Sequence, residues 1–285
     1  MTFHRSLPIV PLLLAAALSA QQGSLNSHQA RRTLLDRVEN LSPTDLNQIT
    51  ARAQAGDASA EYQLAFVQKD RGIFHSWMLK SAEQGYVPAE CELGMSYLRE
   101  GAPHLPVYSP VPKYAEADEW LRRAALAGDS EAQFWLGQGY TLGRLGSVDY
   151  HQALIWLRRA AAQRHSLAEY SLGQMYREGE GVRENDSVAA SWFKKSADDA
   201  ADYLEVEAAV TQLAYLYRDT ELSRNHLEAY KWLVIIGSSL DPPYYEDANR
   251  AAKHLTKSQI AQGQRMARDW KSTHLQAPKE AVEAR

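Results

Sequence analysis

The chain has 285 residues, of which 45% are hydrophobic and 23% are charged, and its formal net charge at pH 7 is −4. This acidic balance argues against a nucleic-acid-binding protein, because such proteins present a basic face to the phosphate backbone. The single cysteine, Cys91, excludes an intramolecular disulfide and a cysteine cluster for a metal, and a small thiol packed on a helix is the simplest interpretation of it. Abundant alanine and few β-branched residues favour helices.

The beginning of the chain differs from the rest. Residues 9–20 form an apolar run that is too short to span a bilayer comfortably. Small residues, Ala17 and Ser19, stand at the −3 and −1 positions for cleavage after Ser19. We therefore expect residues 1–20 to be a secretory signal peptide and the mature protein to be periplasmic in a Gram-negative bacterium, with an uncleaved N-terminal anchor as the alternative.

The next segment leads into an array of repeats. Residues 21–41 are expected to form a polar linker followed by one helix with an apolar stripe. Ser42 followed by Pro43 is a typical helix start, with the serine as N-cap and the proline at the first helical position. Because the helix that begins there ends near Gly56, as a repeat does, we expect residues 42–57 to be a half repeat that caps the array.

A repeated pattern runs through the middle of the chain. Five tryptophans recur at similar intervals: Trp77, Trp120, Trp156, Trp192 and Trp232. Self-similarity at a period of roughly 35 to 45 residues indicates a solenoid of stacked helical hairpins, because one hairpin cannot bury its apolar face alone.

Each repeated position has a mechanical reason. Ala132 and Leu136 lie four residues apart and share one face of a first helix. Gly137 removes a side chain where a neighbouring helix must come close. Asp149 and Asn185 follow glycine-containing loops and are predicted N-caps of second helices.

The pattern Ala-x-x-x-Leu-Gly-x-x-Tyr, a Gly-containing loop and then Ala-x-x-Trp resembles the Sel-one-like repeat family, which is related to tetratricopeptide repeats. The units at 130–167 and 168–203 match this pattern closely. Those at 58–86, 87–129 and 204–238 are degenerate. The resemblance implies an all-α fold, an α/α solenoid of about five helix-turn-helix repeats.

The expected solenoid occupies residues 42–240, and its second helices carry the largely buried side chains of Trp120, Trp156, Trp192 and Trp232. Residues 241–272 are interpreted as C-terminal capping helices, in which Thr256 and Gln259 form a capping box. Residues 273–285 are polar and are expected to be a loose tail.

The sequence offers no recognisable catalytic or metal-binding motif. It contains no His-Glu-x-x-His, no Gly-x-Ser-x-Gly elbow and no phosphate-binding loop. We therefore predict a non-enzymatic protein and name no catalytic residue, no metal site and no cofactor.

A partner-binding surface follows from helical geometry. Counted from the first alanine of each repeat, positions +2, +3, +6 and +9 of the first helix are expected to point away from the stack. In tetratricopeptide-like arrays the first helices line the concave side, so these residues would form an aromatic groove with basic edges, the composition of binding hot spots. The predicted residues are Tyr62, Phe66, Phe134, Trp135, Tyr170, Arg177, Tyr215 and Arg218. The alternative is that the aromatics at +2, such as Phe134 and Tyr170, wedge between hairpins and belong to the core.

Three classes of function follow from the resemblance. The leading one is a periplasmic interaction protein that holds a protein partner through the groove or through the proline-rich insertion at 102–112. Some relatives are immunity proteins against phospholipase toxins delivered by type VI secretion, and the same features suit an envelope-stress or assembly adaptor. The second class is a β-lactam-interacting enzyme, but such relatives carry a cysteine pair in each repeat. The third is a structural protein that binds peptidoglycan. No class requires nucleic acid or, after signal cleavage, a membrane span.

Overall fold

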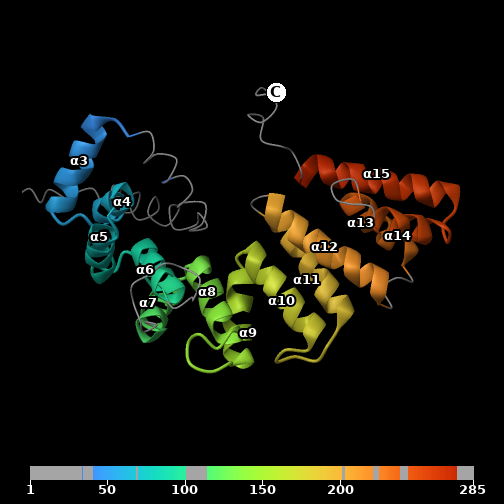
Figure 1. Cartoon of the computed structure of the whole chain (residues 1–285), viewed down its shortest axis with the longest axis horizontal. Coiled ribbons are helices and arrows are strands. Elements are labelled where there is room, and N and C mark those ends of the chain that lie inside the picture. The colour runs from blue at the N-terminus through green and yellow to red at the C-terminus, as the bar shows by residue number, and fades with distance from the viewer. Residues whose placement is uncertain are drawn as a thin grey trace, which may run out of the picture. The chain divides into compact units, whose positions relative to one another are not determined.

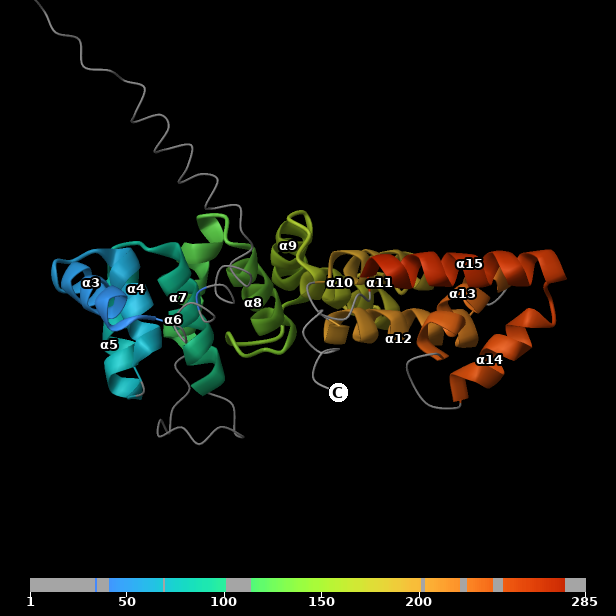
Figure 2. The same cartoon turned by 90° about the horizontal axis from the view of Figure 1, so that it is seen from above.

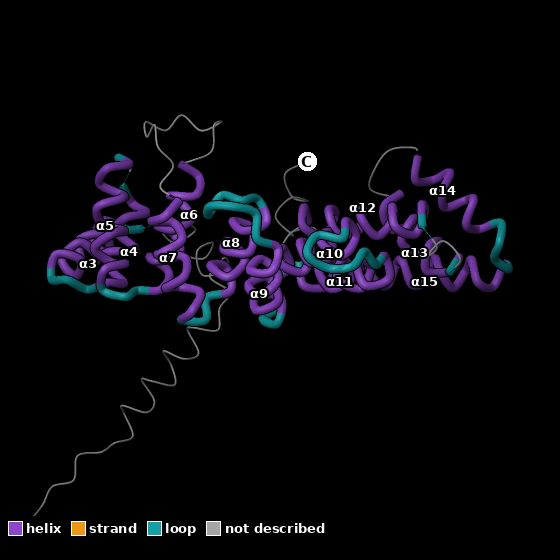
Figure 3. The backbone as a smooth tube through the Cα atoms, turned by 90° about the horizontal axis from the view of Figure 1, so that it is seen from below, coloured by secondary structure: helices purple, strands orange, loops and turns teal. Residues whose placement is uncertain are grey.

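The computed structural model describes residues 34, 41–68, 70–100, 114–200, 203–220, 225–237 and 243–274. Within these ranges the chain forms helices and loops without any strand (Figure 3), which confirms the predicted all-α class. None of the described helices is both long enough and apolar enough to cross a membrane. The predicted signal peptide, nearly all of 21–41, the proline-rich insertion and residues 275–285 lie outside the described residues.

The chain divides into two compact units, Met1–Trp135 and Leu136–Arg285, and the division falls within one helix, α8. The described helices of the first unit are α3 (Pro43–Gln54), α4 (Ala58–Val67), α5 (Arg71–Glu83), α6 (Val87–Glu100) and α7 (Tyr114–Leu126). The helix α8 (Ser130–Thr141) belongs in part to each unit. The described helices of the second unit are α9 (Tyr150–Ala161), α10 (Ser166–Glu178), α11 (Asp186–Asp199), α12 (Tyr203–Asp219), α13 (His226–Gly237), α14 (Pro243–Ala252) and α15 (Lys257–His274).

In the first unit, each helix packs on the next along the chain, from α3 to α7 (Figure 1). The array begins as predicted, with Pro43 in the first turn of α3 and the Ser42 side chain accepting a hydrogen bond from the Asp45 amide. The helix ends before Gly56, whose φ of 86° suits glycine. The helix α3 therefore starts and stops where its sequence signals predict.

In the second unit, α9 to α13 also pack in sequence, and α10, α11 and α12 lie side by side (Figure 1). The predicted caps are present, since Asp149 accepts from the Gln152 amide and Asn185 from the Val188 amide. Both C-terminal helices pack on α13, with α15 lying along it (Figure 2). Thr256 and Gln259 form the predicted capping box at the start of α15.

The glycine of each Leu-Gly pair meets the residue that follows the repeat tryptophan. A Cβ added to Gly137 would lie 2.5 Å from the Leu157 side chain, and one added to Gly173 would lie 2.7 Å from Phe193. Such distances are well inside van der Waals contact, so only glycine lets the two helices of these hairpins approach this closely. The mechanical role predicted for Gly137 is confirmed.

The expectation for the tryptophans needs a correction. Trp156 and Trp232 are 5% and 1% exposed, but Trp120 and Trp192 are only half-buried. The residue after the tryptophan is at most 2% exposed in every repeat: Met78, Leu121, Leu157, Phe193 and Leu233. In the first four repeats it is more deeply buried than the indole ring, whereas Trp232 is as buried as Leu233.

A basic side chain three residues further along covers the ring in four of the repeats. The pairs and their distances to the ring centroid are Lys80 over Trp77 at 4.3 Å, Arg123 over Trp120 at 4.5 Å, Arg159 over Trp156 at 4.7 Å and Lys195 over Trp192 at 4.4 Å. The interaction between a cation and the face of an indole ring is favourable, and the charged end of the basic side chain can remain in water. The basic side chain therefore covers the ring, so the tryptophan does not have to be buried completely.

Candidate partner-binding surface

A first helix is enclosed on several sides, which limits what it can offer to a partner. In the second unit, α10 contacts its own second helix α11, the preceding helix α9 and the next first helix α12. Six half-exposed side chains form a narrow line along α10 and α12. These side chains, which we call the first-helix strip, are Tyr170, Gln174 and Arg177 on α10, and Thr211, Tyr215 and Arg218 on α12. They are three or four residues apart, so each set shares one helical face.

The two arginines of the strip are held by neighbouring side chains. Arg177 donates a hydrogen bond to the side-chain oxygen of Gln212 and forms a 2.8 Å ion pair with Glu178. The guanidinium carbon of Arg218 lies 4.8 Å from the centroid of the Tyr215 ring. Side chains fixed before binding lose less conformational entropy when a partner arrives.

Polar bonds join successive first helices along this side. Gln138 of α8 donates to the Ser171 hydroxyl of α10 at 2.6 Å, and Arg177 bonds Gln212 across from α10 to α12. The Gln138 and Gln212 side chains are half-buried, so their spare donors and acceptors can be met by water or by a partner. The strip therefore combines polar side chains with two aromatic rings.

Two of the predicted partner-binding residues belong to the core, and their assignment to the surface is wrong. Tyr62 and Phe134 are each 6% exposed. Both stand at +2, the position for which wedging between hairpins was the alternative. Tyr62 packs against Tyr86 with ring centroids 5.4 Å apart, a contact between the first helix α4 and the residue that leads from α5 into α6.

The other two predicted residues of the first unit are half-buried. Phe66 makes edge-to-face contacts with Tyr62 at 5.1 Å and Phe74 at 5.6 Å. The Trp135 indole N–H donates to the Glu131 carboxylate at 2.7 Å. These contacts orient both rings while leaving part of each accessible.

The remaining four predicted residues come together in the second unit. Tyr170, Arg177, Tyr215 and Arg218 are all half-buried members of the first-helix strip. Tyr170 also leans on the fully buried Phe193, with ring centroids 5.3 Å apart. Its +2 position therefore combines a packed edge with an accessible one.

Sequence reasoning missed a set of buried polar residues that directly follow the repeat alanine. They are Glu61, Glu90, Gln133 and Glu169, and none is more than 5% exposed. The first three have clear partners: Glu61 accepts from Gln84 at 2.6 Å, Glu90 pairs with Arg123 at 2.7 Å, and Gln133 donates to the Ala125 carbonyl at 3.0 Å. The signal was present, because Ala-Glu recurs at the same place in three units.

Glu169 is the exception in this set. One of its oxygens, Oε2, is buried without a hydrogen-bond partner. Burial, reinforced by the negative charge of Asp199, raises the pKa of this carboxyl to about 8, although Lys195 and Arg164 oppose the shift. The next repeat has the apolar pair Val210 and Ile235 at the places of Glu169 and Lys195. Because apolar side chains can fill the same two positions, we interpret the buried carboxyl as a packing residue of the repeat.

The described residues give little material for catalysis. Among them no group of three or more His, Cys, Asp or Glu side chains is placed to hold a metal ion. Cys91 is 2% exposed on α6, and burial raises the pKa of its thiol well above the ordinary value. Because the thiolate is the nucleophile, such a cysteine is a packing residue, as its sequence context predicts.

The comparisons with known proteins agree with this architecture. The Sel1 repeat family matches residues 75–86, 87–129, 130–165, 166–200 and 208–234. No curated protein shows a significant match to the chain.

Two solved structures are similar to the fold. The first is c5321, a protective antigen present in uropathogenic Escherichia coli strains that displays an SLR fold. It is 25% identical, with a TM-score of 0.64 over 90% of this chain and 55% of that one. The second is a Sel1 repeat protein from Oxalobacter formigenes, 24% identical, with a TM-score of 0.56 over 72% of this chain and 59% of that one. The chain thus spans less than two thirds of either protein.

The matched segments cover more than half of the chain and coincide with the helix pairs described above, from α6 and α7 to α12 and α13. Repeats of this kind generally serve as non-enzymatic scaffolds for contacts between proteins. With its recurring Leu-Gly contacts, capped hairpins and ring-covering cations, the chain belongs to the Sel1 repeat family.

Proposed function

We propose that this protein is a non-enzymatic scaffold that binds a protein partner through the first-helix strip of its second unit. The observation that carries the proposal is the composition of the strip: two tyrosines and two arginines from two successive first helices, half exposed and held by contacts to their neighbours. Tyrosine and arginine are enriched among residues that dominate binding energy, because they offer large contact areas and directed hydrogen bonds.

The test is a measured affinity for an identified partner. The partner is recovered by affinity purification on the mature protein from periplasmic and secreted fractions and identified by mass spectrometry. Replacing Tyr215 by alanine should then weaken binding by about 2 kcal/mol in isothermal titration calorimetry. Tyr150→Ala is the matched control, because Tyr150 is also half-buried but belongs to the second helix α9. Equal losses for the two variants would reject the strip as the binding surface.

A narrower form of the proposal concerns location and partner. The apolar run at 9–20 supports export to the periplasm, and an exported interaction scaffold with net negative charge suits an immunity protein that neutralises a secreted antibacterial effector of the phospholipase type. Cells that express such an effector in the periplasm should survive when they also make this protein. If survival of these cells is the same with and without this protein, the result would favour the alternative role of an envelope-stress or assembly adaptor.

A further inference from the structure

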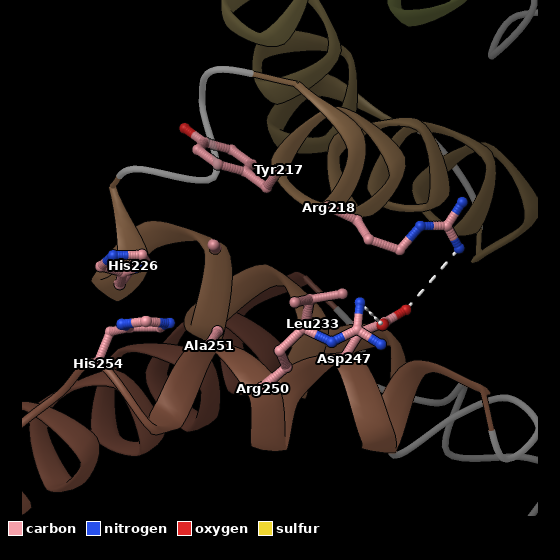
Figure 4. Close-up of a pocket in the computed structure, with 9 residues that line it drawn as sticks. Tyr217, Arg218, His226, Leu233, Asp247, Arg250, Ala251 and His254 are labelled. Carbon is pink, nitrogen blue, oxygen red and sulfur yellow. Dashed lines mark ion pairs between the residues drawn. The ribbon is translucent and has the colours of Figure 1, made fainter.

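A small cavity lies in the second unit where the last repeat meets the C-terminal helix α14 (Figure 4). Its volume is about 190 Å³, and it is lined by side chains of α12, α13 and α14 together with His254, which follows α14. Sites for whole small molecules usually start at roughly 300 Å³. This cavity therefore has room for a single side chain rather than for a cofactor.

Charge is unevenly distributed around the cavity. Arg218 of α12 and Arg250 of α14 approach the two oxygens of one carboxylate, Asp247, at 3.8 Å and 3.3 Å (Figure 4). Two guanidinium groups carry ten N–H donors and two positive charges, whereas the carboxylate supplies one negative charge. The group of three is positive overall, and the Arg250 side chain is 70% exposed, so it is free to turn toward an incoming anion.

The opposite wall adds further donors. The imidazole rings of His226 and His254 are stacked with centroids 4.3 Å apart and an angle of 14° between their planes. The Tyr217 ring also lines the cavity, and burial raises the pKa of its phenol, which stays neutral. Between the polar groups lie the aliphatic side chains of Ala229, Leu233 and Ala251, a surface suited to methylene groups.

We propose that this pocket takes an aspartate or glutamate side chain of the bound protein partner. The carboxylate of this side chain would contact Arg250 and Arg218, because guanidinium groups form strong charge-assisted hydrogen bonds with carboxylates. The methylene groups of the same side chain would lie over Leu233. Arg218 belongs both to the pocket and to the first-helix strip, so the acidic residue would anchor one end of the partner on that strip. The inference rests on the proposed function, because the acidic side chain is assigned to the protein partner that binds the first-helix strip.

The first test uses a small molecule that carries the proposed ligand group, a side-chain carboxylate. The α-amide of N-acetylglutamic acid, which keeps only the side-chain carboxylate, is titrated into the full chain while the histidine ring signals are followed by NMR. Saturable shifts at His226 and His254 are expected, and the neutral glutamine analogue should give none. Absence of shifts with the acid would overturn the proposal. Tighter binding of inorganic phosphate than of the carboxylate would overturn it in favour of a free-anion site.

Variants give the second test. Arg250→Gln should weaken binding of the carboxylate probe at least about tenfold, and Asp247→Asn should strengthen it several-fold by removing the competing carboxylate. Arg265→Gln is the matched control, because Arg265 is an exposed arginine of α15 outside the pocket. Thermal unfolding of each variant checks that the fold persists. Unchanged binding by folded Arg250→Gln would contradict the assignment.

The two proposals fail in distinguishable ways. If the probe binds but Tyr215→Ala leaves the affinity for the partner unchanged, the pocket stands and the strip fails. If the partner depends on Tyr215 but the probe does not bind, the strip stands and the pocket fails.

Discussion

Glu169 illustrates how a single residue can set the pH response of a repeat. Its counterparts Glu61 and Glu90 have an amide or a guanidinium group as partner, whereas Oε2 of Glu169 has none. The carboxyl has its ordinary pKa of 4.5 in the unfolded chain and a pKa of about 8 in the folded one. A raised pKa means that folding favours the protonated form, so its contribution to stability is complete below about pH 4.5 and is lost as the pH rises through 8.

We therefore expect Glu169→Gln to remove a pH dependence of stability. The variant should match the wild type near pH 5 and exceed its free energy of unfolding by about 4 kcal/mol at pH 9, because glutamine cannot ionise. Gln133, at the same place one repeat earlier, shows that glutamine suits this position through its bond to the Ala125 carbonyl. Urea unfolding at a series of pH values measures the effect.

The control for this experiment is Glu184→Gln, since Glu184 is exposed in the loop between α10 and α11. That substitution should leave the pH profile of the wild type unchanged. If Glu169→Gln also leaves it unchanged, the buried carboxyl does not titrate in this range.

The two kinds of tryptophan should respond differently to truncation. Trp156 is 5% exposed, so Trp156→Ala should cost about 3–5 kcal/mol of unfolding free energy. Trp135 is only half-buried, and its truncation should cost clearly less in the same urea titration. Equal losses would place Trp135 in the core and remove it from any binding surface.

At the scale of the hairpin, the close contact between Gly173 and Phe193 should dominate over helix propensity. Alanine at position 173 would gain up to about 1 kcal/mol of propensity in a free helix. Its Cβ would lie 2.7 Å from the ring of the fully buried Phe193, so overpacking should give a net loss of about 1–3 kcal/mol. Thermal and urea unfolding of Gly173→Ala measure the balance.

Gly72→Ala serves as the opposing case. Gly72 is an exposed glycine in the first turn of α5, and an added Cβ would meet only the Asp70 carboxylate at 3.2 Å. This variant should be neutral or slightly more stable. Destabilisation of both variants alike would show that the glycines matter for a reason other than helix contact.

The helices and their caps were predictable because they depend on neighbours in sequence, and the Leu-Gly contact was predictable because the pattern recurs from repeat to repeat. The degree to which each side chain of a helix is buried was less predictable. Periodicity gives the direction of Tyr62 and Phe134 but not the number of helices around them, and both proved to be in the core. In the same way, the recurring tryptophan identified the second helix but not its own burial, because Trp120 and Trp192 are only half-buried while the residue after each is fully buried.

At the scale of the whole molecule, the candidate sites depend on stacking between repeats. Tyr170 and Tyr215 are 45 positions apart in the chain and lie on adjacent first helices only because α10 packs on α12. The repeat pattern predicted that relation. It could not predict the pocket, because α14 is not a repeat helix and its Asp247 and Arg250 carry no recurring signal.

The proposed export makes a prediction for the N-terminus of the mature protein. The mature protein should begin near residue 20 and be released by osmotic shock, because the apolar run would be removed during secretion. Intact-mass and N-terminal peptide mass spectrometry of the fractions give the result. A soluble cytoplasmic species that retains Met1 would contradict export and, with it, the immunity role.

The central claim is that a protein partner sits on the first-helix strip, and site-specific photo-crosslinking tests it most directly. The photoreactive amino acid p-benzoylphenylalanine is placed at Gln174 or Thr211 on the strip, or at Lys194, an exposed residue of the second helix α11. The two strip positions should crosslink to the same single protein, and position 194 should not. Equal crosslinking from position 194, or none from the strip, would contradict the claim.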